Sequence, residues 1–173
     1  PSYPRYARIY SSTRSDASWG AAKELTITRD TLSSVAHPAV SPDGHWIYFV
    51  SDMPGGEGGL DLWRIELDGR GGVIGGVENL GPTINTPGNE MFPTFRPNGE
   101  LYFSSDGHPG MGGLDLFVYK DSTVTNLGFP MNSPGDDFHM TFEGLHNRGF
   151  FSTSRGDARG WDHVMSFEKP EVL

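Results

Sequence analysis

The sequence predicts an all-β fold, a β-propeller built from four-stranded antiparallel blades. Glycine and proline are abundant, at 24 and 13 of 173 residues, and follow no collagen-like period. Such a composition is typical of many short strands joined by turns. A unit of about 50 residues recurs along the chain, as in propeller blades. No helical pattern is convincing, because the one candidate, 19–27, is short and runs into a threonine-rich stretch.

The repeat is clearest in a glycine-rich loop. The segment SDMPGGEGGLDLW occupies 51–63, and SDGHPGMGGLDLF occupies 105–117. Asp61 in the first segment corresponds to Asp115 in the second, 54 residues later. A loop that is duplicated together with its flanks indicates a structural repeat.

The repeated unit has four parts in a fixed order. A short strand ends in a Pro-Asp-Gly or Pro-Asn-Gly turn, because proline presets its φ and glycine accepts a positive one. An aromatic strand comes next, then the glycine-rich loop with a third strand, and last a connector containing Asn-Leu-Gly. The unbroken apolar character of the aromatic strands predicts burial on both faces. In the first copy these parts lie at 38–44, 46–52, 60–67 and 79–81. In the second copy they lie at 93–99, 101–106, 114–120 and 126–128.

A third copy is more divergent, and the N-terminal residues resemble the end of a preceding copy. We therefore expect a partial blade and connector at 1–34, blades at 35–90 and 91–137, and a last blade with an exit segment at 138–173. Because propellers have about four to eight blades, these three blades and a partial one are expected to belong to a larger propeller. The last sheet edge needs a covering strand. Residues 22–27 could close the ring, and otherwise we expect dimerisation or aggregation.

Composition excludes several classes of function. The formal charge is −9 and the 13 lysines and arginines are scattered, whereas a nucleic-acid-binding protein needs a basic face. No apolar run approaches the ~18 residues of a membrane helix, so membrane insertion is not expected. The absence of cysteine excludes disulfides and thiolate chemistry. The first residues lack a signal-peptide pattern, so a signal has been removed or the chain starts within a longer protein.

The glycine-rich loop has a structural interpretation. Its glycines would supply positive φ, and Asp61 and Asp115 would accept hydrogen bonds from loop amides. Asp162 is the corresponding acid in the third copy.

The alternative interpretation is a cation site made by Asp52, Glu57 and Asp61, since calcium takes about six to eight oxygen ligands from such loops. A ligand set used in every blade should recur, yet Met111 replaces Glu57 in the second copy. The copies therefore favour the structural role, and no metal is expected. The third copy keeps only Asp157 and Asp162.

No motif points to catalysis or to a cofactor. The sequence has no G-x-S-x-G elbow, no phosphate-binding loop and no zinc spacing. Paired carboxylates about 5–9.5 Å apart would suit a glycosidase, but repeat-equivalent positions favour structural duty for these acids. His37 and His139, at the starts of innermost strands, are interpreted as satisfied structural residues. The other histidines are His45, His108, His146 and His163.

Loop residues that differ between copies are the candidates for partner contact, since recognition tends to reside in loops on a rigid scaffold. The arginines among them could pair with carboxylates of a partner. These candidates are Met53, Pro54, His108, Met111, Arg155 and Arg159.

The segments HPAVSPDGHWIYFVSDMPGGEGGLDLWRIEL at 37–67 and FPTFRPNGELYFSSDGHPGMGGLDLF at 92–117 resemble TolB-type, WD-repeat-like propeller blades. With NLGPTINTPGNE at 79–90, they are similar to the propeller of the OmpA-like lipoproteins of Bacteroidetes, which serve the type IX secretion system. The resemblance implies a periplasmic, outer-membrane-associated protein whose peptidoglycan-binding domain is separate from the propeller. The resemblance also implies O-glycosylation sites at the Asp-Ser/Thr patterns of Thr31 and Ser122.

Together these observations predict a non-enzymatic protein-interaction scaffold without a cofactor. Its expected partners are proteins of the secretion machinery or the cell envelope. The alternative is an accessory, substrate-binding propeller of a peptidase or glycosidase, which a hydrolase domain elsewhere in the full protein would favour.

Overall fold

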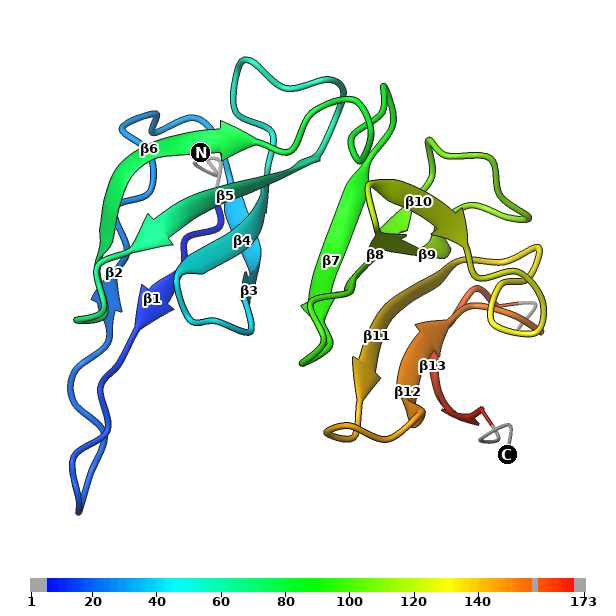
Figure 1. Ribbon diagram of the computed structural model, residues 1–173. Coiled ribbons are helices and arrows are strands. Elements are labelled where there is room, and N and C mark those ends of the chain that lie inside the picture. Colours follow the sequence, from blue (N-terminus) through cyan, green and yellow to red (C-terminus); the bar gives the residue numbers. More distant parts are fainter. Residues whose placement is uncertain (1–5, 157–158, 170–173) are drawn as a thin grey trace.

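A computed structural model describes residues 6–156 and 159–169, and in these residues the chain forms only β-strands, turns and loops (Figure 1). The strands make up successive antiparallel sheets that lie side by side in chain order. The all-β fold predicted from the repeat is confirmed. None of the described residues forms a helix that is long and apolar enough to cross a membrane.

The first and second blades are complete four-stranded meanders. Each strand pairs with the next one along the chain, so the sheet orders are β3-β4-β5-β6 and β7-β8-β9-β10. The strands of the first blade are β3 (Val35–Val40), β4 (Trp46–Ser51), β5 (Asp61–Leu67) and β6 (Val73–Asn79). Those of the second are β7 (Glu90–Phe95), β8 (Leu101–Ser105), β9 (Asp115–Lys120) and β10 (Thr123–Asn126).

The third blade has three strands in the described part of the chain, in the order β11-β12-β13. Its last strand, β13, is therefore an edge strand. A short ribbon of β1 and β2 precedes the first blade. The bounds are β11 (Asp137–Phe142), β12 (Arg148–Thr153), β13 (His163–Glu168), β1 (Tyr10–Ser11) and β2 (Lys23–Glu24).

The tight turns follow the expected chemistry. Gly44 and Gly99 end the Pro-Asp-Gly and Pro-Asn-Gly turns with φ of 73° and 90°. A side chain would be strained at such angles, whereas glycine is not. Gly144, in the divergent third turn, also has a positive φ of 54°.

The core lies between neighbouring sheets, as expected for strands buried on both faces. In β4, Ile47 and Phe49 belong to the cluster on the N-terminal side of the first blade, whereas Tyr48 and Val50 belong to the cluster facing the second blade. A strand packed on both faces needs apolar residues at successive positions. A third cluster, around Leu116, lies between the second and third blades.

The N-terminal segment packs on the first blade. Ile9 and Ile27 join the core cluster of that blade, and β2 pairs with β1. Residues 22–27 therefore pair at the N-terminal side, and the idea that they cover the edge of the last blade is wrong.

Candidate functional site

The glycine-rich loops need glycine because the connector backbone passes against them. A Cβ on Gly58 would lie 2.1 Å from the carbonyl oxygen of Thr86, and one on Gly112 would lie 2.1 Å from that of Gly135. Within these two loops, only Gly55 has a positive φ. The expectation that the glycines supply positive φ is therefore wrong for the rest of them. Close backbone approach explains Gly58 and Gly112, whereas a Cβ on Gly56 or Gly110 would meet the carboxylate of Asp61 or Asp115.

The two loop acids organise their loops. Asp61 Oδ2 accepts hydrogen bonds from Glu57 N at 2.5 Å and Asn79 Nδ2 at 3.0 Å. Asp115 Oδ2 accepts hydrogen bonds from the backbone amides of Met111, at 2.7 Å, and of the following glycine. Both aspartates are almost fully buried. Each carboxylate thus holds a crossing loop against the start of its own third strand.

Asp162 lies at a different position from these acids. Ser51 pairs with Asp61 and Ser105 with Asp115, whereas Thr153, their counterpart in the third blade, pairs with His163. The strand register therefore places His163 where the other blades have an aspartate, and Asp162 is exposed one residue earlier. The sequence offset misses this shift because the third loop differs in length.

Two of the residues proposed for a cation site, Asp52 and Asp61, accept hydrogen bonds from separate parts of the backbone. Asp52 Oδ1 accepts a hydrogen bond from Ser34 N at 2.7 Å, and Asp61 binds within its own loop. Among residues 6–156 and 159–169, no three carboxylate or imidazole groups gather as a metal site would require. Asp157 lies outside the described residues.

His108 connects the second blade to the preceding connector. Its Nε2 lies 2.8 Å from the carbonyl oxygen of Ile84, and its ring packs 5.2 Å from Phe117 and 5.9 Å from Phe103. The ring is therefore part of the contact between the second blade and the connector that precedes it.

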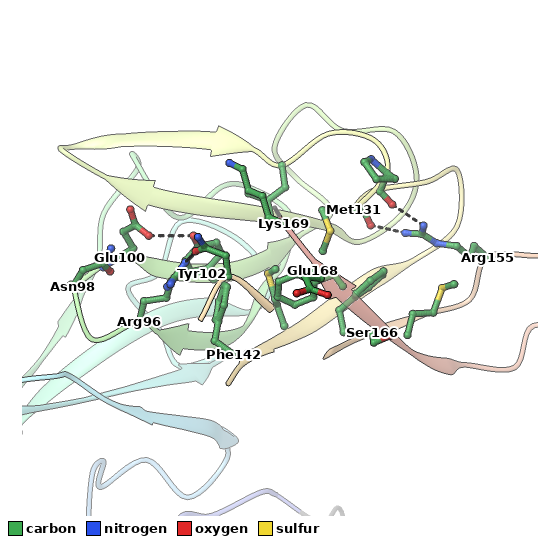
Figure 2. Close-up of a pocket in the computed structure, with 17 residues that line it drawn as sticks. Arg96, Asn98, Glu100, Tyr102, Met131, Phe142, Arg155, Ser166, Glu168 and Lys169 are labelled. Atoms are coloured by element: carbon green, nitrogen blue, oxygen red, sulfur yellow. Dashed lines mark hydrogen bonds between the residues drawn. The ribbon is translucent and has the colours of Figure 1, made fainter. Parts of the chain in front are cut away.

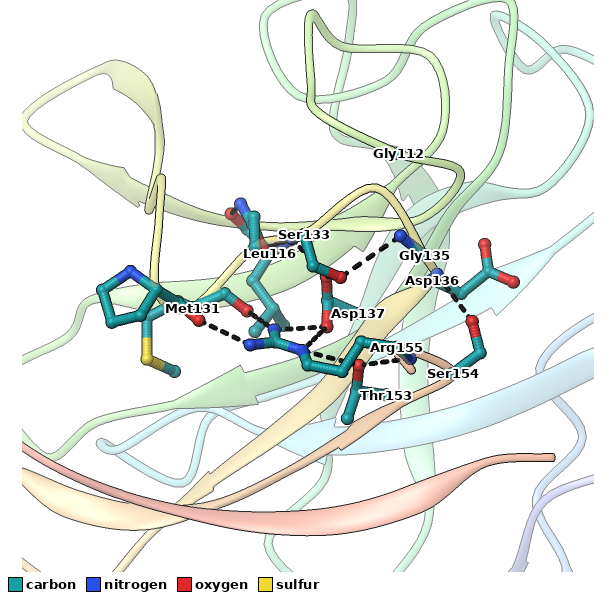
Figure 3. A network of polar contacts seen from close by, with 12 residues as sticks. Gly112, Leu116, Met131, Ser133, Gly135, Asp136, Asp137, Thr153, Ser154 and Arg155 are labelled. Atoms are coloured by element: carbon teal, nitrogen blue, oxygen red, sulfur yellow. Dashed lines mark hydrogen bonds and ion pairs between the residues drawn. The ribbon is translucent and has the colours of Figure 1, made fainter. Parts of the chain in front are cut away.

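Arg155 makes the corresponding contact in the third blade (Figure 3). Its Nη1 donates to the carbonyl of Pro130 at 2.7 Å, and its Nη2 donates to the carbonyl of Met131, which corresponds to Ile84. Nη2 also lies 2.6 Å from Asp137 Oδ1, a carboxylate that is fully buried. Such a charge is costly to bury unless it is paired.

Three of the six partner-contact candidates therefore have internal roles. Met53 is buried in the core of the first blade, and His108 and Arg155 hold connectors. The interpretation of these three as exposed loop residues is wrong, whereas their contact with a partner stays a prediction. The candidates whose residues are exposed are Pro54, Met111 and Arg159. Both glycosylation candidates, Thr31 and Ser122, are also exposed.

Glu90 begins the innermost strand of the second blade, where Asp137 begins that of the third. Its Oε1 accepts hydrogen bonds from the hydroxyls of Thr86 and Ser105, both at 2.6 Å. Burial raises the pKa of Glu90 above its ordinary value despite these donors. A connector hydroxyl binds this carboxylate in both blades, since Ser133 Oγ donates to Asp137 Oδ2 at 2.7 Å, and the third blade adds Arg155.

A column of rings runs along the innermost strands. His37, Phe92 and His139 occupy equivalent positions, each with a positive φ, at irregularities in strand pairing. The ring centroids of His37 and Phe92 lie 4.2 Å apart, and those of Phe92 and His139 lie 5.4 Å apart. Burial, followed by the charge of His139, lowers the pKa of His37. His37 Nδ1 is buried without a hydrogen-bond partner among the described residues, so the expectation of a satisfied ring is wrong for this atom.

Connector asparagines cover the start of each third strand in the first two blades. Asn85 accepts from Leu62 N at 2.8 Å and donates to Leu62 O at 3.0 Å, and Asn132 does the same for Leu116 at 2.8 and 2.9 Å. Val164 occupies the corresponding position of β13, opposite Ser152. It is 72% exposed, whereas Leu116 is 1% exposed.

A cleft between the second and third blades lies beside this open edge (Figure 2). Its volume is about 890 Å³, and it is lined by Tyr102, Phe142, Phe151 and Phe167 among others. The equivalent cleft between the first and second blades has a volume of about 250 Å³. Within residues 6–156 and 159–169, one edge of β13 is therefore unpaired, and it lies beside this cleft.

Comparisons with known proteins extend the description of the fold. No protein-family model matches the chain. Over 119 residues, 67% of the chain, it is 29% identical to the oxygen-dependent choline dehydrogenase of Brucella anthropi and 30% identical to that of Brucella ovis. The match covers 20% of each enzyme, so the chain spans about a fifth of the length of these relatives.

Several solved structures have the same arrangement of sheets. A TolB protein from Agrobacterium tumefaciens aligns with a TM-score of 0.53 and 17% identity, over 80% of this chain and 44% of its own. A prolyl endopeptidase aligns with a TM-score of 0.56 and 13% identity, over 93% of this chain and 21% of its own. The α-L-arabinofuranosidase from Lactobacillus brevis aligns with a TM-score of 0.51 and 11% identity, over 88% of this chain and 57% of its own. The fold is that of a β-propeller, as the sequence predicts.

Proposed function

We propose that this chain is the propeller of a non-enzymatic protein-interaction scaffold in the periplasm, associated with the outer membrane. The observation that carries the proposal is that the loops and connectors of the described residues expose large apolar side chains. Met111 is 47% exposed and Phe129 79%. Exposed apolar patches on otherwise polar surfaces are characteristic of protein–protein contact sites.

The internal duties of the polar groups support the same proposal. His108, Arg155, Asp61 and Asp115 are each occupied by contacts within the protein. Groups that are committed in this way serve the rigidity of the scaffold, and rigid scaffolds present their remaining surface for recognition.

The sequence resemblance supports a particular assembly. The blade sequences most resemble those of PorE, an OmpA-like lipoprotein of the type IX secretion system, so the proposed partners are proteins of that machinery or of the cell envelope. Peptidoglycan would be bound only by another domain of the full-length protein.

Co-purification of the tagged full-length protein from envelope membranes of its native host tests this function. Recovery of secretion-machinery proteins, retained after deletion of any peptidoglycan-binding domain and lost after deletion of the propeller, is the expected result. Recovery that survives loss of the propeller would overturn the proposal.

The second candidate is an accessory propeller of a peptidase or glycosidase. It is favoured by the likeness to the prolyl endopeptidase and the arabinofuranosidase, which extends to the fold. Hydrolysis of prolyl peptides or of arabinosides by the full-length protein, reduced when the propeller is deleted, would support this candidate and displace the scaffold.

A further inference from the structure

The first blade carries an ion pair where the second blade has uncharged residues. Strand pairing aligns Tyr48, Arg64 and Glu78 in one row across β4, β5 and β6. At the positions of the arginine and the glutamate, the second blade has Val118 and Thr125. The architecture of a blade therefore does not require an ion pair at this place, and another role is needed to explain it.

The guanidinium group of Arg64 is held from two sides. Its Nε and Nη2 both contact Glu78 Oε2, at 2.8 and 2.7 Å. Its Cζ lies over the ring of Trp46, 4.2 Å from the centroid. A guanidinium that is already fixed in this way loses little conformational freedom when it binds a ligand.

The ion pair retains hydrogen-bonding capacity. Among the described residues, Arg64 Nη1 has one partner, the hydroxyl of Tyr48, at the long distance of 3.4 Å. Within the same part of the chain, no donor contacts the second carboxylate oxygen of Glu78, Oε1. The pair can thus still donate one hydrogen bond and accept another.

This row of side chains faces the cleft between the first and second blades, whose volume is about 250 Å³. The second blade contributes Phe95, Leu101 and Tyr119 to the lining. Among the described residues that line the cleft, Arg64 and Glu78 are the two that carry a charge. The lining therefore combines apolar surface with a polar pair of zero net charge.

Such a lining selects a neutral ligand that carries hydroxyl groups. A carboxylate or a phosphate would be repelled by Glu78, and an ammonium group would be repelled by Arg64. A hydroxyl both donates and accepts hydrogen bonds, so two neighbouring hydroxyls can satisfy the guanidinium and the carboxylate together. Pockets of this kind hold a ligand by apolar walls and a few placed polar groups.

We propose that this cleft binds one pyranose ring of a carbohydrate through a pair of neighbouring hydroxyls. One hydroxyl oxygen accepts a hydrogen bond from Arg64 Nη1, and the adjacent hydroxyl donates to Glu78 Oε1. The carbon face of the ring packs on the apolar wall that includes Tyr119. This site goes beyond the scaffold function and does not depend on it.

Titration with single sugars tests the site. D-glucose, D-galactose and D-mannose, which differ in the orientation of neighbouring hydroxyls, are added separately to the ¹⁵N-labelled 173-residue chain. The indole N–H of Trp46 reports binding in proton–nitrogen correlation spectra, because its ring contacts Arg64. Trp19, which is 66% exposed between β1 and β2, is the internal control. Saturable shifts at Trp46 alone are expected with at least one sugar, with a dissociation constant on the order of 1 mM for so small a ligand.

A variant that copies the second blade tests the ion pair. Arg64→Val combined with Glu78→Thr should weaken binding at least about tenfold while leaving the circular dichroism spectrum unchanged. Arg148→Val combined with Glu143→Thr removes another exposed ion pair, outside the cleft, and should bind the sugar as the wild type does. If the first variant unfolds, Glu78→Gln, which keeps the size of the side chain, should still weaken binding about tenfold.

Sodium acetate and methylammonium chloride serve as charged probes at the same concentrations. Shifts at Trp46 with either salt and with none of the sugars would show an ion site. Absence of shifts with all three sugars, or undiminished affinity in the variant that copies the second blade, would show that the ion pair does not bind carbohydrate. Each of these outcomes overturns the proposal. Partner recovery in the co-purification experiment tests the scaffold function separately and is expected to be the same in the sugar-site variant.

Discussion

Asn132 bonds both backbone groups of Leu116, accepting from its N–H at 2.8 Å and donating to its C=O at 2.9 Å. The side-chain amide thereby acts as one peptide unit of an additional strand. Asn85 makes the same pair of bonds to Leu62. Because both asparagines are fully buried, these bonds have no solvent competitor.

Replacing Asn132 with alanine should therefore destabilise the protein strongly. Two buried backbone groups lose their partners, and the free energy of unfolding should fall by about 2–4 kcal/mol. Urea denaturation measures the change. Asn98→Ala, in an exposed turn, is the control and should cost less than about 1 kcal/mol. Equal losses in the two variants would contradict the assigned role.

Arg155→Ala should cost about 3 kcal/mol of unfolding free energy, because it leaves the buried Asp137 carboxylate without its cation. Thermal denaturation of this variant and of Arg29→Ala, an exposed arginine, makes the comparison. A melting temperature unchanged by Arg155→Ala would show that its side chain does not hold the connector.

Gly112→Ala tests the close approach of loop and connector. The new methyl group would meet the Gly135 carbonyl, and the resulting displacement should cost about 1–3 kcal/mol. Gly76→Ala is the matched control, since a Cβ there meets nothing within 4 Å and its φ is not positive. If both alanines are tolerated equally, close packing is not why glycine occupies this loop.

Glu90 should make stability depend on pH in a definite direction. Its pKa is raised by burial, so the folded state binds the proton more tightly than the unfolded state. The contribution of Glu90 to stability is fully present below its ordinary pKa of 4.5 and is lost as pH rises through the raised value. Glu90→Gln should therefore be less destabilising at pH 7 than at pH 4, as measured by urea denaturation at both pH values. The reverse order would contradict burial as the dominant cause of the raised pKa.

His37 should make stability depend on pH in the opposite direction to Glu90. Its pKa lies below the ordinary 6.5, so the unfolded state takes up the proton first and stability declines as pH falls below that value. His37→Phe, which copies Phe92 of the second blade, should flatten the decline between about pH 7 and pH 5. Differential scanning calorimetry across this range would contradict the assignment if wild type and variant kept parallel profiles.

The repeat made much of the fold predictable. The order of strands, the turns at Gly44 and Gly99 and the two-sided burial of β4 all follow from local sequence and periodicity. In the described residues the third blade has three strands, and the sequence indicated this as an open sheet edge. Its cleft was not predictable, since it depends on Gly149 standing across from Phe142, a pairing set by strand register.

The candidate site was harder to predict for a physical reason. Variation between copies marks residues that meet different neighbours, and the sequence does not say whether the neighbour is a partner or the next blade. His108 and Arg155 belong to the second case. The asparagine contacts had a signal, because Asn85 and Asn132 recur at one position of the connector, but a single sequence does not reveal which strand they bond.

Photo-crosslinking in native cells tests the central claim that this propeller docks a protein. A photoreactive amino acid at Met111, an exposed loop residue, should yield one crosslinked protein, whereas the same amino acid at Ile74, an exposed apolar residue on β6, should not. Crosslinks of equal yield and identity at both positions, or none at Met111, would contradict the account.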